Sequence, residues 1–115
     1  MKKRDALAAL AALAQENRLD VFRLLVEAGP EGLAAGKVAS ALRLAPNTLT
    51  FHFDRLREAG LIAVRRDGRQ MIYAARFDRM NALLGYLTEN CCRGRMQQCA
   101  TSECKTEMVL EPERA

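Results

Sequence analysis

The side chains best able to do chemistry in this chain are four cysteines, which all fall in its last quarter: Cys91, Cys92, Cys99 and Cys104. A group of thiolates without histidine or paired carboxylates selects soft ions, and trivalent arsenic or antimony takes three sulfurs in a pyramidal site. The six residues between Cys92 and Cys99 include a glycine, which lets the chain fold back. We therefore expect Cys91, Cys92 and Cys99 to bind As(III) or Sb(III), with Cys104 as a further candidate ligand.

The same cysteines are compatible with three other states. All four thiolates could bind zinc, although the adjacent Cys91 and Cys92 differ from the usual zinc motif, in which two to four residues separate the cysteines. A thiol redox switch would end in a disulfide instead of a metal complex. Unliganded cysteines are the third alternative. The residues alone leave these alternatives open.

An enzyme is not expected from this sequence. The cysteines form no C-x-x-C motif, and neither a phosphate-binding glycine-rich loop nor an acid–base partner accompanies them. No organic cofactor is indicated. A protein interaction module without any ligand is a further alternative to a sensor.

Arginines form the second informative group. The segment 43–79 contains eight arginines and four acidic residues, so it carries the whole formal net charge of +4 of the chain. Arginine suits bidentate contacts with phosphate and guanine. A solvated charged surface is the simpler explanation of such a segment, and the elements around it must decide between the two.

The apolar spacing predicts a mainly α fold with a small β-hairpin. Helices are expected over 6–15, 17–28 with Asn17 as the cap, 37–42, 46–59 and 78–90. The third and fourth helices form a helix-turn-helix. Two β-prone runs, 61–64 and 71–74, flank Asp67-Gly68, which indicates a type I′ hairpin. This order is that of a winged helix-turn-helix.

The fourth helix has one face suited to reading DNA. Leu49, Phe53 and Leu56 point inward, and the only histidine, His52, is expected in the core beside them. The outward and flanking residues are candidates for contacts in the major groove of double-stranded operator DNA: Asn47, Thr48, Thr50, Phe51 and Arg55. On the hairpin, Arg65, Arg66 and Arg69 are candidates for phosphate or minor-groove contacts.

A length of 115 residues fits one small domain. Residues 1–92 are expected to form the DNA-binding and dimerisation domain, and 93–115 a flexible tail that contributes cysteine ligands. The apolar run after Lys2-Lys3-Arg4 is short and flows into a further helix, so a secretory signal is not favoured and a cytoplasmic protein without membrane contact is expected.

These motifs together resemble the ArsR/SmtB family of metal- and metalloid-responsive repressors over about residues 6–92. The matching segments are 17–19, 48–53, 56–61, 65–69 and Tyr73. The resemblance implies a homodimer formed through the first and last helices, operator binding by the apo form and release on ligand binding.

Within the family, the resemblance points to one type of ligand site. Zinc-sensing members use carboxylates and histidine on the last helix, and one arsenic-sensing type has cysteines on the third helix; this chain has neither. The segment 87–92 is similar to another arsenic-sensing type, in which a third cysteine follows. The additional Cys104 departs from that pattern and leaves the choice of three ligands open.

Overall fold

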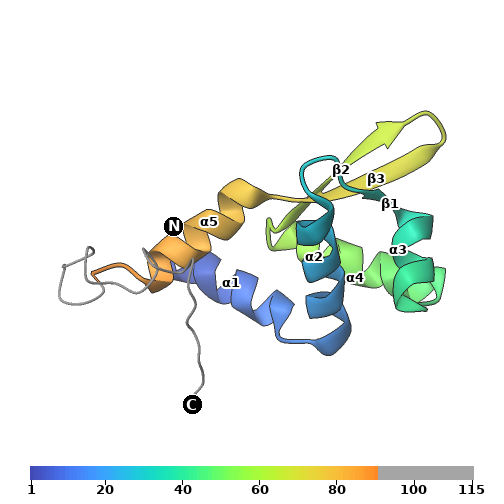
Figure 1. Ribbon diagram of the computed structural model, residues 1–115. Helices are drawn as coiled ribbons and strands as arrows, with labels where there is room; N and C mark the ends of the chain where they lie inside the picture. The colour runs from blue at the N-terminus through green and yellow to red at the C-terminus, as the bar shows by residue number, and fades with distance from the viewer. Residues whose placement is uncertain (91–115) are drawn as a thin grey trace, which may run out of the picture.

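The computed structural model describes residues 1–90 of the 115-residue chain (Figure 1). In chain order, this part contains α1 (Lys3–Leu13), α2 (Glu16–Ala28), β1 (Leu33–Ala34), α3 (Ala35–Leu42), α4 (Pro46–Glu58), β2 (Ile62–Asp67), β3 (Gln70–Ala75) and α5 (Phe77–Leu87). The predicted mainly α fold with a β-hairpin after the helix-turn-helix is confirmed. No helix within residues 1–90 is long and apolar enough to cross a membrane.

The junction between α1 and α2 differs from the prediction. Gln15, and not Asn17, caps α2: its side-chain oxygen accepts a hydrogen bond from the Arg18 amide at 2.9 Å. The Arg18 guanidinium in turn donates to the Ala12 carbonyl at 2.8 Å. Because Gln15 has an extended backbone, its side chain can fold over the first turn of α2 and accept from an amide there, as a cap must. Arg18 thereby joins the end of α1 to the start of α2.

The hairpin of β2 and β3 is called the wing below. The hydrophobic core lies between the helices and the inner side of this wing. Its largest fully buried side chains are Phe53, Leu25, Leu56, Leu61, Val21 and Val38. Helix α1 contributes small residues to it, Ala6, Ala9 and Ala12, which allow close approach of its backbone. Leu13 packs against this core as well, whereas Leu7 and Leu10 of the same helix remain 59% and 39% exposed. Helix α1 is thus anchored by alanines and presents leucines to the outside.

The sheet contains one strand more than the sequence indicated. Its order is β1-β3-β2, and all neighbours are antiparallel. The two-residue strand β1 pairs Leu33 with Tyr73 and Ala34 with Ile72. Two residues are too few to show a period of two, so the pattern could not reveal this strand. Its pairing joins the start of α3 to the wing.

The predicted type I′ turn is wrong. Asp67 pairs with Gln70, so the two residues of the loop are Gly68 and Arg69 instead of Asp67 and Gly68. Of these two only Gly68 has a positive φ, 65°. A positive φ at the first position alone is the pattern of a type II′ turn, which places glycine there. Arg69 therefore lies at the tip of the hairpin.

Two close contacts fix the wing against the helices. Gly32 has φ 75°, and a Cβ at this position would collide with the carbonyl oxygen of Tyr73, so only glycine lets β1 approach β3 here. The ring of Tyr73 stacks on that of Phe53 with centroids 3.7 Å apart and planes inclined by 10°. The stack connects the middle of β3 to the buried face of α4.

Helix α5 ends at Leu87, three residues before the predicted end at 90. Leu83 is buried in the core, whereas Leu84 and Leu87 are 53% and 54% exposed. Helices α1 and α5 contact each other at the end of the molecule remote from the wing tip (Figure 1). The predicted tail, 93–115, lies outside the described residues.

Candidate nucleic-acid interface

The three residues 43–45 between α3 and α4 form the turn of the helix-turn-helix and set the geometry of its two helices. Arg43 adopts a left-handed conformation with φ 56°, and the Leu44 amide bonds to the Ala39 carbonyl at 3.1 Å, which closes the end of α3. Pro46 then opens α4 at its first turn, where a proline is preorganised for helix entry. The turn therefore places the two helices at a fixed angle.

Helix α4 divides into a buried and an exposed face, as the sequence predicted. Leu49, Phe53 and Leu56 are buried. The candidate DNA-reading residues of the helix are all exposed: Asn47, Thr48, Thr50, Phe51 and Arg55. The hydroxyl of Thr50 donates to the Pro46 carbonyl at 3.0 Å. Phe51 is a large aromatic ring at 50% exposure on this otherwise polar surface.

The arginines of α4 are partnered within the helix. The Arg55 guanidinium lies over the Phe51 ring, with 4.9 Å between its central carbon and the ring centroid, and pairs with the Glu58 carboxylate at 2.8 Å. A guanidinium nitrogen of Arg57 lies 3.8 Å from a carboxylate oxygen of Asp54. These charges are exposed and compensate one another, so the exposed face of α4 adds no net positive charge.

The wing is different, because its arginines have no acidic partner among residues 1–90. The Arg65 guanidinium donates to the Glu31 carbonyl at 3.1 Å, and that of Arg66 to the Gly68 carbonyl at 3.3 Å. Carbonyl groups leave the positive charge intact. Arg69 at the tip makes no hydrogen bond to a described residue. With Asp67 as the one acid in the hairpin, the wing keeps most of its positive charge.

His52 is a core residue, as predicted, with only 5% of its surface exposed. Burial, and then the positive charge of Arg18, lower the pKa of His52 below its usual value of 6.5. Neither ring nitrogen has a hydrogen-bond partner among the described residues. The ring meets that of Phe51 edge-on, with centroids 5.8 Å apart. His52 therefore lies beneath the exposed face of α4, in surroundings that disfavour its protonated form.

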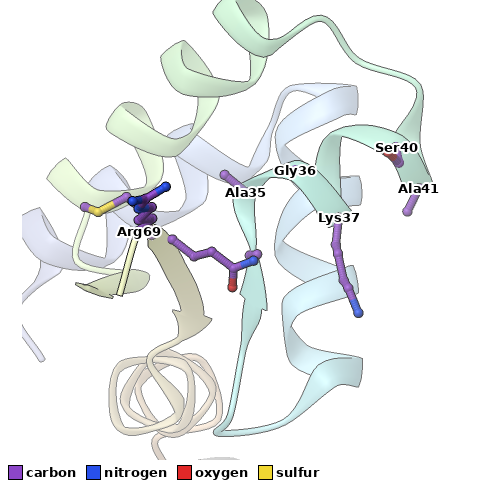
Figure 2. A pocket seen from close by; sticks show the side chains of 9 residues that line it. Ala35, Gly36, Lys37, Ser40, Ala41 and Arg69 are labelled. Atoms are coloured by element: carbon purple, nitrogen blue, oxygen red, sulfur yellow. The ribbon is translucent and has the colours of Figure 1, made fainter. Parts of the chain in front are cut away.

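Sequence reasoning missed one part of this surface. A cleft between α3 and the wing is lined by Lys37, Ser40, Arg69 and Gln70, among others (Figure 2). Of these four, only Arg69 was a predicted site residue. The other three lie in or beside the predicted helix-turn-helix and hairpin, but nothing in the sequence pattern indicated that they line one cleft, which forms because β1 draws α3 to the wing.

The predicted metalloid ligands, Cys91, Cys92, Cys99 and Cys104, lie outside the described residues. Within residues 1–90, no group of three histidine, cysteine or acidic side chains is placed to hold a metal ion. Cys91 directly follows Asn90, the last described residue, three positions after the end of α5. In the sequence, Cys91 and Cys92 are thus the thiols nearest to the end of α5, whereas Cys99 and Cys104 lie further along the chain.

Known proteins resemble this chain in sequence and in fold. Residues 13–65 match the helix-turn-helix domain family. The uncharacterized HTH-type transcriptional regulator YceK of Bacillus subtilis is 39% identical over 77 residues, which cover 66% of this chain and 76% of YceK.

Two solved structures share the fold. An ArsR-like transcriptional regulator from Rhodococcus superposes with a TM-score of 0.67 at 21% identity, covering 92% of this chain and 96% of its own. The homodimeric winged helix-turn-helix DNA-binding domain of a possible ArsR-family regulator from Mycobacterium bovis gives 0.61 at 24%, covering 76% and 81%. The fold is therefore the winged helix-turn-helix, and the chain belongs to the helix-turn-helix transcriptional regulators.

Proposed function

We propose that this protein is an ArsR-type repressor that binds operator DNA as a homodimer and releases it when As(III) or Sb(III) binds cysteine thiolates. The observation that carries the proposal is the position of the thiols in the sequence. Cys91 and Cys92 come four and five residues after the end of α5, and α5 is a helix that leaves leucines uncovered. A ligand bound there acts on a surface suited to dimerisation.

The dimer is argued from the exposed apolar side chains of α1 and α5. Leu7 and Leu10 on α1 are 59% and 39% exposed, and Leu84 and Leu87 on α5 exceed 50%. The two helices contact each other, so a second copy could cover both. The homodimeric relative in fold from Mycobacterium bovis supports this arrangement. A twofold axis here would present two α4 helices to successive major grooves, about 34 Å apart.

Each DNA-binding residue then has a role that fits its surroundings. Asn47, Thr48 and Thr50 lie in the first half of α4, which enters the groove in this class of protein. Phe51 suits contact with a thymine methyl, and Arg55 suits guanine. The wing arginines suit phosphates, because their charge is not cancelled.

Release requires that the metalloid bind the DNA-free conformation more tightly than the DNA-bound one. Couplings of this kind are about 1–3 kcal/mol, or roughly 5- to 150-fold in affinity. Three thiolates match the coordination of a trivalent pnictogen, so Cys91, Cys92 and Cys99 suit it, with Cys104 as a substitute. Binding would reposition the end of α5 and change the spacing of the two wings.

The test is an operator-release experiment with fully reduced protein and a duplex selected by the wild type from a random-sequence pool. Arsenite should release the wild type, whereas Cys91→Ser/Cys92→Ser should bind the duplex with unchanged affinity and not be released. Cys104→Ser is the matched control and should still respond. Retained release by the double variant would contradict the proposed site.

The two principal alternatives give different results in the same assay. A redox switch would release DNA on addition of a disulfide-forming oxidant and remain bound with arsenite under reducing conditions. A zinc sensor would respond to zinc and recover on chelation.

A further inference from the structure

A cleft of about 290 Å³ lies where α1, α2 and α4 meet, apart from the one beside the wing. Helix α1 lines it with three alanines, Ala8, Ala11 and Ala12. The charged groups of its lining come from the other two helices: Arg18 of α2, and Arg55 and Glu58 of α4. The cleft therefore combines an apolar wall with two cations and one anion.

Arg18 brings to this cleft a positive charge that no carboxylate within residues 1–90 neutralises. The Nε of this partly buried side chain donates to the Ala12 carbonyl at 2.8 Å, which fixes the guanidinium at the end of α1. Its two terminal nitrogens make no hydrogen bond to a described residue. A planar guanidinium with both terminal nitrogens available is the group that binds a carboxylate through two parallel hydrogen bonds.

His52 reports on the charge of Arg18. It is the only histidine of the chain and lies three residues before Arg55 on α4. Burial, and then the positive charge of Arg18, lower its pKa. A ligand that neutralised Arg18 would weaken the second effect and raise the pKa of His52 towards its ordinary value. The imidazole thus provides a probe for occupancy of the cleft.

Arg55 connects the cleft to the exposed face of α4, which is the proposed reading face. Its guanidinium pairs with the Glu58 carboxylate at 2.8 Å and lies over the Phe51 ring, 4.9 Å from the ring centroid. An anion in the cleft would compete with Glu58 for this guanidinium and draw it away from Phe51. Occupancy of the cleft would therefore alter a candidate contact with DNA.

We propose that this cleft binds a small monocarboxylate with a short apolar body, and that its binding weakens the affinity for DNA. The carboxylate pairs with Arg18 and attracts Arg55, while the apolar body packs on the alanines of α1. The excess of positive charge in the lining favours an anion, and the small volume limits the ligand to a few non-hydrogen atoms. The site does not depend on the cysteines; only its effect on DNA rests on the proposed function.

The main test is an NMR titration of the full chain with butyrate at constant ionic strength. Butyramide, a neutral analogue of similar shape, is the matched control ligand. Butyrate should shift the methyl resonances of Ala8, Ala11 and Ala12 in a saturable manner, leave that of Ala41 on α3 in place, and raise the pKa of His52. Absence of these changes, or an equal response to butyramide, would overturn the proposed carboxylate site.

Two variants remove the site in different ways. Ala8→Leu fills the cleft from an exposed position on α1, where leucine is a good helix former, and Ala41→Leu is the same change at an exposed position on α3. Arg18→Met removes the charge and should raise the pKa of His52 without any ligand. Ala8→Leu and Arg18→Met should each lower the butyrate affinity about tenfold, and Ala41→Leu should not change it. Unchanged affinity of Ala8→Leu would contradict the site even if Arg18→Met failed to fold.

DNA titrations test the second half of the proposal. Saturating butyrate should weaken binding of the wild type to the selected duplex about fivefold or more, and should leave Ala8→Leu unaffected. If the wild type binds no duplex, the proposed function fails, whereas the NMR titration still decides whether the cleft binds a carboxylate. If the wild type binds butyrate and DNA independently, the coupling through Arg55 is wrong.

Discussion

Helix α4 and the wing both carry arginines on exposed surfaces, yet their electrostatic settings are opposite. On α4, Arg55 and Arg57 pair with carboxylates of the same helix. On the wing, arginines donate to backbone carbonyls or stay without a partner in the described part. Under the proposed function, attraction to phosphate would come mainly from the wing arginines. The exposed face of α4 would then discriminate between sequences by shape, methyl contact and hydrogen bonding.

Separating the two tasks has a physical advantage. Phosphate attraction acts on every duplex alike and weakens with salt, whereas contacts with base edges act on one sequence. A reading helix with surplus positive charge would bind all DNA more tightly and so reduce the ratio between specific and non-specific affinity. The ion pairs within α4 cancel its positive charges, and so would preserve the ratio between specific and non-specific affinity.

The largest effect is expected where the two regions are joined. Phe53→Ala removes a fully buried ring that stacks on Tyr73 of β3, and it should lower the free energy of unfolding by about 3–5 kcal/mol. Urea denaturation measures this loss. Tyr73→Phe keeps both rings and should cost far less. A loss below about 1 kcal/mol for Phe53→Ala would mean that the stack does not hold helix and wing together.

Phe51→Ala tests the helix alone. This ring is half-exposed at the centre of the reading face, so its loss should weaken binding to the selected duplex by about 1–3 kcal/mol. Binding to an unrelated duplex and the salt slope should not change, as titrations at several salt concentrations can establish. Equal weakening of binding to both duplexes would mean that Phe51 contributes to affinity for any DNA. In that case α4 would not differ from the wing in the way proposed.

Arg66→Gln tests the wing alone. One phosphate contact fewer should lower the salt slope by about 0.9 on any duplex, or roughly threefold in affinity change between 50 and 200 mM salt. Asp67→Asn is the matched opposite change and should strengthen binding to every duplex at low salt. An effect of Arg66→Gln confined to the selected sequence would show that the wing also reads bases.

His52 allows a test of stability behind the reading face. Because burial and Arg18 lower its pKa, the unfolded chain takes up a proton below pH 6.5 that the folded chain resists. The free energy of unfolding should therefore fall as the pH drops from 7 to 5.5, and fall less steeply in His52→Leu. Urea titrations at both pH values give the comparison. Parallel pH profiles would remove His52 as the cause.

Local patterns were sufficient for most of this fold. The 3.6-residue spacing of Leu49, Phe53 and Leu56 located the buried face of α4, and by exclusion its exposed face. Such periodicity is robust because burial of the whole stripe depends on it. The hairpin could also be predicted from a local pattern, because two β-prone runs flank a turn that contains Gly68.

The errors arose where atomic detail or distant contacts decide the outcome. Gln15 instead of Asn17 caps α2, because the helix starts at Glu16, two residues earlier than a cap at Asn17 would place its start. Strand β1 exists only through its pairing with β3, and the cleft of Lys37 follows from that pairing. No local pattern contains such information. The cysteine site stays a prediction, since its residues lie beyond the described ones.

The pairing of β1 with β3 also bears on engineering. Backbone hydrogen bonds join β1, which directly precedes α3, to the hairpin, and the Phe53–Tyr73 stack joins α4 to the same strand, so both helices of the helix-turn-helix are connected to β3. Outward side chains of α4 could therefore be exchanged to redirect the protein to a new target sequence. Under the proposed function, the hairpin would keep its contacts with the flanking phosphates, so only the outward side chains of α4 would need redesign.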